Sequence, residues 1–172
     1  MKHLWSPWRS VHIDQTVRSA PKESNKSSVF SRLEQQGEDE ETLILWRGKE
    51  VFVIMNLYPY NNGHLMIVPY RQVAQYELLN VKEMTEMARV LDLCIRAIKK
   101  VFTPDGINVG MNLGKAAGAG IPDHLHMHIV PRWHGDTNFM PTIAETKVIP
   151  ESLKDSYLKL SDVMASMELS DH

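Results

Sequence analysis

The chain has 172 residues and a formal net charge of −2, with 19 Lys and Arg against 21 Asp and Glu. This length suits a single domain with a sizeable core, and the near-neutral balance provides no broad attraction for nucleic acid or an anionic membrane. One cysteine excludes an internal disulfide, and no apolar stretch is long enough to span a bilayer. The start of the chain lacks the apolar core of a signal peptide. We therefore expect a cytoplasmic globular protein with no nucleic-acid or membrane partner.

The first quarter of the chain has no regular hydrophobic period. We expect an irregular arm over residues 1–41, with a short helix at 28–36 and a solvated acidic turn at 38–41. Further along, runs of β-branched and large apolar residues separated by turn residues are typical of strands. They predict strands at residues 42–46, 51–56, 64–68, 107–113 and 124–132.

The clearest helix is expected over residues 81–102, where apolar residues recur at spacings of three and four. Asn80 suits its N-cap, and Glu83 sits where a capping box places its acid. Cys94 falls on the apolar face and is expected in the core. A second apolar stripe predicts a C-terminal helix at about 150–169.

Hairpin-linked strands with one long helix indicate an α+β fold rather than a wound parallel sheet. The expected architecture is an antiparallel sheet of about five strands with one long helix and a C-terminal helix. We expect a single domain over residues 1–172, with its core at about 42–141.

Three histidines, His124, His126 and His128, alternate with apolar residues in a predicted strand. Alternation places the three imidazoles on one face and the apolar residues on the other, in the core. The imidazoles must face a cleft or a polar network, because buried imidazoles without partners are costly. Two chemistries suit such a row: metal ligation, and nucleophilic catalysis in which neighbouring groups orient the attacking imidazole.

The preceding segment, residues 114–120, consists almost entirely of Gly and Ala. With so few side chains, its backbone N–H groups can approach anionic oxygens closely. Beside the histidine row this favours a phosphate next to a nucleophile. A catalytic metal site is the alternative, although no carboxylate or cysteine lies at an obvious ligand spacing.

The segment HLHMHIV resembles the His-φ-His-φ-His-φ-φ signature of the histidine triad (HIT) superfamily of nucleotide hydrolases and transferases. Other segments are similar to its nucleotide-binding strands, at 52–56 and 63–69, and to its phosphate loop, at 112–114 and 117–120. LWSPWR and VPRWHGDTNFMP resemble the bacterial branch related to diadenosine tetraphosphate phosphorylases and hydrolases. The resemblance spans about residues 4–141.

The resemblance implies a role for each of four histidines. His126 would attack the α-phosphorus and form a nucleotidyl-histidine intermediate. His128 would hydrogen-bond in the site and contact phosphate, and His124 would support the row from its far end. His64 would add a further imidazole near the triad.

The resemblance also implies substrate contacts. Asn56 would hydrogen-bond the ribose or its neighbourhood. Phosphate contacts would come from Asn112, Gly118, Ala119 and Gly120, with backbone N–H groups of the last two stabilising developing charge. Trp133 either stacks on a base or anchors an ordinary loop, and the sequence leaves both interpretations open.

Many members of this branch carry a structural zinc held by a CxxC pair, a histidine after the third strand and the first triad histidine. The corresponding residues here are Ser28, Ser31, Gln72 and His124. Serine and glutamine are poor zinc ligands beside thiolate and imidazole, so we predict no structural zinc and no cofactor. The usual glutamine and hydroxyl residue before the triad are also missing, so phosphate contacts must depend more on backbone.

The leading function is cleavage of the α-phosphate link of a dinucleoside polyphosphate, through a nucleotidyl-histidine. Whether the enzyme is a hydrolase or a phosphorylase stays open at this point. The alternative function is a nucleotide- or partner-binding module with weak or vestigial catalysis. The resemblance also implies a homodimer that brings two sheets edge to edge.

Overall fold

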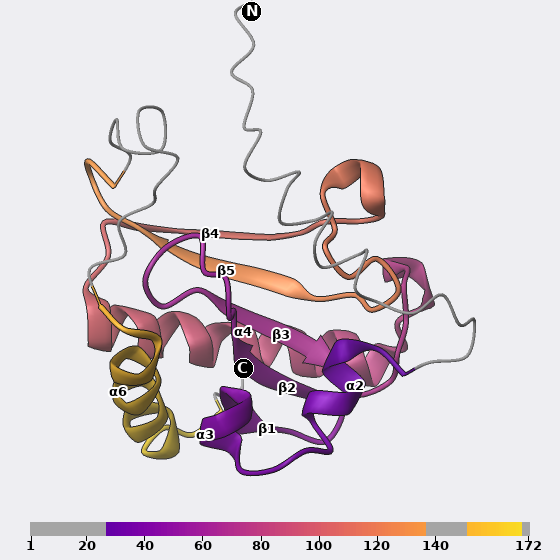
Figure 1. Cartoon of the computed structure of the whole chain (residues 1–172), viewed down its shortest axis with the longest axis horizontal. Helices are drawn as coiled ribbons and strands as arrows, with labels where there is room; N and C mark the ends of the chain where they lie inside the picture. Colours follow the sequence, from indigo (N-terminus) through magenta and orange to yellow (C-terminus); the bar gives the residue numbers. More distant parts are fainter. Residues whose placement is uncertain (1–26, 137–150, 170–172) are drawn as a thin grey trace, which may run out of the picture. The chain divides into compact units, whose positions relative to one another are not determined.

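The computed structural model describes residues 27–136 and 151–169 (Figure 1). Most of the expected N-terminal arm lies outside the described residues. Its described part contains two short helices, α2 (Val29–Leu33) and α3 (Asp39–Thr42). The acidic turn expected at 38–41 is therefore a single helical turn. Acidic side chains occupy its first turn, where they favour the positive end of the helix dipole.

The sheet has five antiparallel strands in the order β1-β2-β3-β5-β4, which confirms the predicted α+β architecture. In chain order they are β1 (Ile44–Arg47), β2 (Val51–Met55), β3 (Leu65–Pro69), β4 (Gly106–Met111) and β5 (Met127–Arg132). β5 lies between β3 and β4, so the strand that contains His128 is inside the sheet (Figure 1).

β5 begins at Met127, so the expected strand at 124–132 is wrong for its first residues. The reason is a different backbone partner, because the Leu125 N–H donates to the carbonyl of Val73, 2.7 Å away, in the segment after β3. The predicted alternation nevertheless persists. Leu125 and Ile129 join the hydrophobic core beneath the long helix, and His128 is paired with Met66 on the other face.

The long helix α4 (Val81–Phe102) has the predicted bounds. Asn80 accepts from the Glu83 N–H, and the Glu83 carboxylate accepts from the Asn80 N–H, which forms the expected capping box. Glu83 also binds Arg71 through two hydrogen bonds and is almost fully buried. Cys94 lies fully in the core, and burial raises the pKa of its thiol.

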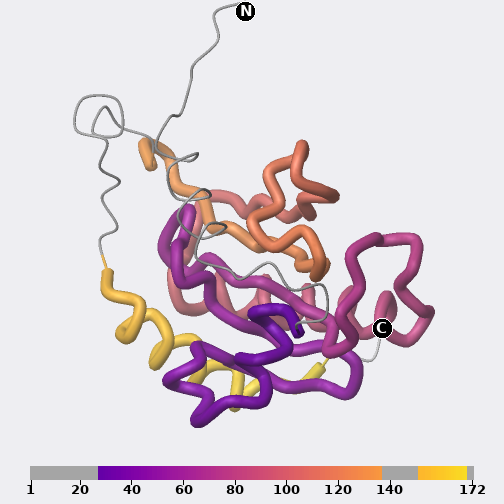
Figure 2. Tube along the Cα trace, turned by 45° about the vertical axis from the view of Figure 1, so that its right-hand side comes forward, coloured from indigo at the N-terminus to yellow at the C-terminus, as the bar shows by residue number. Residues whose placement is uncertain are grey.

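The two faces of the sheet are covered by different elements, α4 on one side and α2 on the other (Figures 1 and 2). On the α2 side, Phe30 packs against a small cluster made by Ile44, Phe52, Ile54, Met66 and Val68. The C-terminal helix α6 (Leu153–Ala165) begins at the Ser152 N-cap and packs on α4 and β1. No helix among the described residues is long and apolar enough to cross a membrane.

Candidate active site

His126 is held by a backbone carbonyl two residues away. Its Nδ1 lies 2.8 Å from the carbonyl oxygen of His124. A carbonyl can only accept, so the hydrogen of the neutral ring lies on Nδ1 and the lone pair lies on Nε2. Burial lowers the pKa of His126, against the opposing effect of this hydrogen bond. The ring is therefore a neutral imidazole with Nε2 in the form that a nucleophile requires.

His64 and His128 form a second imidazole pair. The Tyr60 N–H donates to His64 Nδ1 at 3.0 Å, so a neutral His64 carries its hydrogen on Nε2. That Nε2 lies 3.0 Å from His128 Nδ1, which must then accept, leaving the hydrogen of neutral His128 on its Nε2. The His128 ring also contacts the His126 ring, with centroids 4.8 Å apart. A hydrogen-bond donor is thus fixed on the ring beside the proposed nucleophile.

His124 is fully buried and holds the segment before β5. Its Nε2 lies 2.7 Å from the carbonyl of Pro69, at the end of β3, so Nε2–H donates and Nδ1 accepts. The hydroxyl of Ser28 contacts this Nδ1. Burial is the main reason that the pKa of His124 is lowered. All four histidines that the sequence singled out are therefore brought to one region, and His124 lies at its far end from His64.

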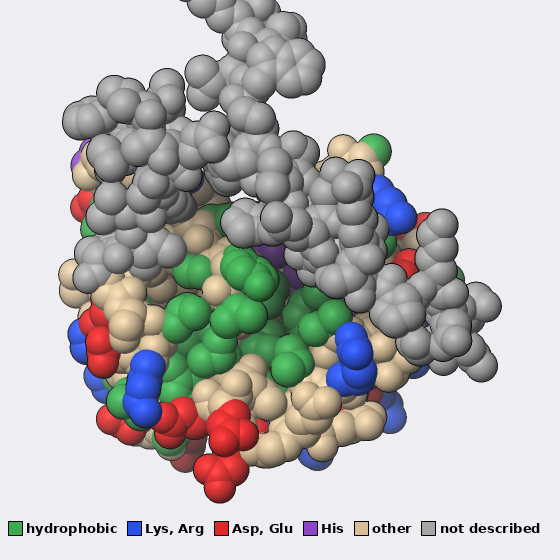
Figure 3. All heavy atoms as spheres, viewed as in Figure 1, with side chains coloured by type: hydrophobic (Ala, Val, Ile, Leu, Met, Phe, Trp, Pro, Cys, Tyr) green, Lys and Arg blue, Asp and Glu red, His purple; other side chains and the backbone are tan. Residues whose placement is uncertain are grey.

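Two aromatic residues that sequence reasoning missed flank the histidines. The Phe30 ring lies 5.5 Å from His124 and 5.1 Å from His126, centroid to centroid. The Tyr60 ring lies 4.7 Å from His64 and 5.7 Å from His128. Neither had a spacing signal, because Phe30 belongs to a short helix and Tyr60 to a turn. In the space-filling view, histidine atoms reach the surface beside hydrophobic side chains (Figure 3).

Asn56 uses both ends of its amide inside the β2–β3 loop. Its Oδ1 accepts from the Tyr58 N–H at 2.9 Å, and its Nδ2 lies 3.4 Å from His64 Nδ1. The side chain therefore helps to hold the loop that carries His64. Its expected contact with a ribose stays a prediction.

The expected phosphate loop is a compact turn closed by its own N–H groups. Ala117 and Ala119 both donate to the carbonyl of Gly114, at 3.2 and 3.3 Å, and Asn112 Nδ2 approaches the carbonyl of Gly118 at 3.4 Å. The Ala119 N–H is thus used within the loop. The Gly120 N–H takes no part in these hydrogen bonds, so it is the better candidate of the two expected backbone donors to phosphate.

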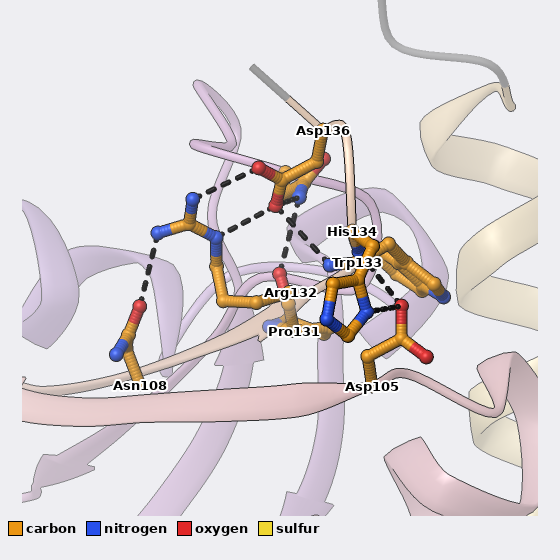
Figure 4. A network of polar contacts seen from close by, with 8 residues as sticks. Asp105, Asn108, Pro131, Arg132, Trp133, His134 and Asp136 are labelled. Carbon is orange, nitrogen blue, oxygen red and sulfur yellow. Dashed lines mark hydrogen bonds and ion pairs between the residues drawn. The ribbon is translucent and has the colours of Figure 1, made fainter.

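Trp133 lies at the other end of β5 from His126. At about 3.3 Å per residue, the strand separates the two by about 20 Å. The Trp133 N–H approaches the Asp136 carboxylate, which also binds Arg132, while the His134 N–H donates to Asp105 (Figure 4). The structure thus separates Trp133 from the triad within one chain, and its stacking role stays a prediction.

The metal alternative for the histidine row has little support in the described residues. They contain no group of three or more His, Cys, Asp and Glu placed to hold a metal ion. Both ring nitrogens of His124 and the Nδ1 of His126 are already in hydrogen bonds.

The sequence signature of the HIT domain family matches residues 37–135, more than half of the chain. This chain belongs to the HIT domain family. Over 158 residues it is 44% identical to the AP-4-A phosphorylase of Mycobacterium tuberculosis, covering 91% of this chain and 80% of that protein. Over 91 residues it is 36% identical to the bis(5'-adenosyl)-triphosphatase of Saccharomyces cerevisiae, covering 52% and 44%.

Solved structures agree with the HIT fold. A zinc-bound histidine triad family protein from Mycobacterium smegmatis superposes with a TM-score of 0.64 at 22% identity, covering 81% of this chain and 94% of that one. At this identity the likeness establishes the fold alone.

Proposed function

We propose that this HIT protein is an enzyme that cleaves the α-phosphate link of a dinucleoside polyphosphate through a nucleotidyl-His126 intermediate. The observation that carries the proposal is the 2.8 Å hydrogen bond from His126 Nδ1 to the His124 carbonyl, in a buried ring whose pKa is lowered. This bond directs the lone pair of the neutral ring to Nε2. The printed names of the mycobacterial and yeast relatives support the substrate class.

The reaction proceeds in two displacements. In the first, His126 Nε2 attacks the α-phosphorus, a P–N bond forms, and the P–O bond to the leaving nucleotide breaks with its electron pair on oxygen. The ring then carries a positive charge, which the Nδ1–H bond to the His124 carbonyl stabilises. In the second, water or inorganic phosphate attacks the phosphorus, and the P–N bond electrons return to Nε2.

The neighbouring groups act on the phosphate. The Nε2–H of His128 donates to a phosphate oxygen, and His64 keeps His128 in that tautomer through the 3.0 Å contact. The Gly120 N–H stabilises negative charge on another oxygen. The role of His128 depends on a hydrogen position that follows from the contacts of His64 with Tyr60 and His128.

The test is incubation with diadenosine tetraphosphate, with and without inorganic phosphate, followed by product analysis. Hydrolysis yields AMP and ATP, whereas phosphorolysis yields ADP and ATP only when phosphate is present. A parallel quench with substrate labelled at the α-phosphate should trap label on His126 as an acid-labile adduct. Turnover without an adduct, and with full activity in His126→Ala, would refute the mechanism.

A second candidate is a nucleotide-binding module with vestigial catalysis. The internally bonded Ala119 N–H favours it, because the loop then offers fewer donors to a phosphate. This candidate predicts that diadenosine tetraphosphate binds and is recovered unchanged.

We also propose that the protein is a cytoplasmic homodimer joined through β4. In the described residues β4 is an edge strand paired with β5 alone. Val109 on this strand is 44% exposed and Leu113 just beyond it is 52% exposed. An exposed edge strand of this kind readily pairs with another chain. Light scattering should give twice the chain mass, and a monomer at micromolar concentration would contradict the proposal.

A further inference from the structure

The first turn of α2 makes a small hydrogen-bonded cluster with the segment that carries the nucleophile. Ser28 is the N-cap of α2, and its Oγ accepts from the Ser31 N–H at 3.1 Å and lies 3.2 Å from Ser31 Oγ. The Ser28 hydroxyl contacts His124 Nδ1, and its N–H donates to Gln72 Oε1 at 2.9 Å. We call Ser28, Ser31, Gln72 and His124 the Ser28 cluster.

One assignment of hydrogens satisfies the polar side-chain contacts in the cluster. Since His124 Nε2–H donates to the Pro69 carbonyl, its Nδ1 must accept, and the Ser28 hydroxyl must donate to it. Ser28 Oγ then accepts twice, from the N–H and from the hydroxyl of Ser31. A hydroxyl has one donor and two acceptor sites, which is the number that this arrangement uses.

The cluster does not fit a zinc ion, although a zinc-bound HIT protein shares this fold. Zinc prefers thiolate, imidazole and carboxylate ligands, whereas three of the four residues offer a hydroxyl or an amide. The fourth, His124, has both ring nitrogens in hydrogen bonds. Where a zinc ion would join these segments, direct hydrogen bonds connect α2 with the segment after β3 and the segment before β5.

The cluster reaches His126 by two short paths. The backbone carbonyl of His124 holds His126 Nδ1 at 2.8 Å. Phe30, two residues after Ser28 in α2, is 2% exposed, and its ring contacts both His124 and His126. A change at Ser28 therefore shifts the packing against the nucleophile and the carbonyl that sets its tautomer.

We propose that the Ser28 cluster is a metal-free clasp in which Ser28 is a positioning residue for His126. Its hydroxyl fixes the tautomer of His124 and holds α2 so that Phe30 packs against the His126 ring. The effect of the clasp on catalysis rests on the proposed function. The tautomer of His124 and the absence of zinc do not depend on that function.

The decisive variants are Ser28→Ala and a matched control, Ser152→Ala. Both remove an N-cap serine that accepts from an N–H three residues on, but Ser152 caps α6. We expect Ser28→Ala to lower kcat about 10-fold to 100-fold with a much smaller change in KM, because a small misplacement of a reacting group is costly. Ser152→Ala should leave kcat unchanged, and Ser28→Thr, which keeps the hydroxyl, should recover most of the loss. Equal kcat values in the two alanine variants would overturn the proposal.

Two further measurements keep the proposal testable if Ser28→Ala does not fold or the protein shows no turnover. Imidazole ¹⁵N shifts of the folded wild type should report His124 with hydrogen on Nε2, and Gln72→Ala should weaken that preference. Elemental analysis of tag-free protein should find no zinc. Hydrogen on Nδ1 of His124, or stoichiometric zinc, would overturn the clasp without bearing on whether His126 is the nucleophile.

A gain-of-metal variant tests whether the four side chains converge on one point. Ser28→Cys, Ser31→Cys and Gln72→His together with His124 supply the two thiolates and two imidazoles of a tetrahedral zinc site. We expect this triple variant to bind one zinc per chain and to keep more activity than Ser28→Ala. Failure to bind zinc in a folded triple variant would contradict the convergence.

Discussion

The two ends of β5 are stabilised by different interactions. Before the strand, His124 and His126 are buried and neutral, and their hydrogen bonds go to backbone carbonyls and a hydroxyl. At the other end, Arg132, the last residue of β5, forms an ion pair with Asp136 through two hydrogen bonds (Figure 4). Asp136 also accepts from Asn61 in the β2–β3 loop.

The end of β5 that carries His126 is suited to catalysis, whereas the end that carries Arg132 is suited to stabilising the fold. Burial at the first end keeps the imidazoles uncharged, and hydrogen bonds to backbone carbonyls determine which ring nitrogen carries the hydrogen. At the second end the Arg132 side chain is 44% exposed, but the Asp136 side chain is only 10% exposed, so the loss of its hydrogen bonds should lower stability. We therefore expect changes before β5 to alter activity and changes after β5 to alter stability.

The largest loss of activity should follow from substitution of His126. Replacing it with alanine removes the attacking nitrogen, so kcat should fall by about 10³-fold or more, while nucleotide affinity largely remains. Single-turnover kinetics and equilibrium titration with diadenosine tetraphosphate measure the two effects. A variant that retains wild-type kcat would show that another group attacks.

A fall in pH should affect the end of β5 where His124 and His126 are buried. Burial lowers the pKa of His124 and His126 below 6.5, so the neutral nucleophile persists below that pH and kcat/KM should decline only as the pH falls through the lowered pKa. In the unfolded chain these histidines take up protons at higher pH than in the folded protein. The free energy of unfolding should therefore decrease as the pH falls below 6.5. Denaturant titration at a series of pH values measures this dependence. A free energy of unfolding that rises as the pH falls would contradict the assignment.

Asp136 should affect stability more than chemistry. Asp136→Asn weakens a pair with Arg132 and contacts with Asn61 and the Trp133 N–H, so we expect a loss of about 1–2 kcal/mol. Asp92→Asn, in an exposed helical pair with Arg96, is the matched control and should cost only about 0.3–0.5 kcal/mol. Urea titration measures both. A large drop in kcat for Asp136→Asn would show that the far end contributes to catalysis.

His134 should have the smallest effect. Its side chain is 94% exposed and contacts Asp105, whose pKa it helps to lower. The hydrogen bond from the His134 backbone N–H is the main cause of the lowered pKa of Asp105, and alanine retains it. His134→Ala should therefore leave kcat and the unfolding midpoint unchanged and should raise the pKa of Asp105 only part of the way toward its usual value, as an NMR titration would measure. Loss of turnover in this variant would show that His134 contributes to catalysis.

Local patterns explain why part of the fold was predictable. The bounds of α4 follow from its apolar period and from the capping box of Asn80 and Glu83, interactions between residues near in sequence. The alternation around His126 predicted correctly that Leu125 and Ile129 face the core, although Leu125 lies just before β5. Ser28 and Gln72 depart from the zinc-binding pattern of the family that the sequence resembles, and residue type then suffices to predict that they are poor zinc ligands.

The details that the sequence could not supply all depend on distant segments. β5 begins late because the Leu125 N–H donates to the Val73 carbonyl. Phe30 contacts the histidine rings from α2, whose N-cap Ser28 contacts His124, 96 residues away. Trp133 is near the triad in sequence but not in space, since an extended strand separates them.

The sequence by itself determined the antiparallel α+β fold and the row of histidines, because both depend on short-range spacing and residue type. It indicated the family through the resemblance of HLHMHIV to a known signature. The tertiary structure alone decided which ring nitrogen of each histidine carries a hydrogen. That choice depends on the Pro69 and His124 carbonyls, the Ser28 hydroxyl and the Tyr60 N–H, which chain folding brings to the rings. Hydrogen-bond direction, rather than histidine content, makes Nε2 of His126 the nucleophile that we propose.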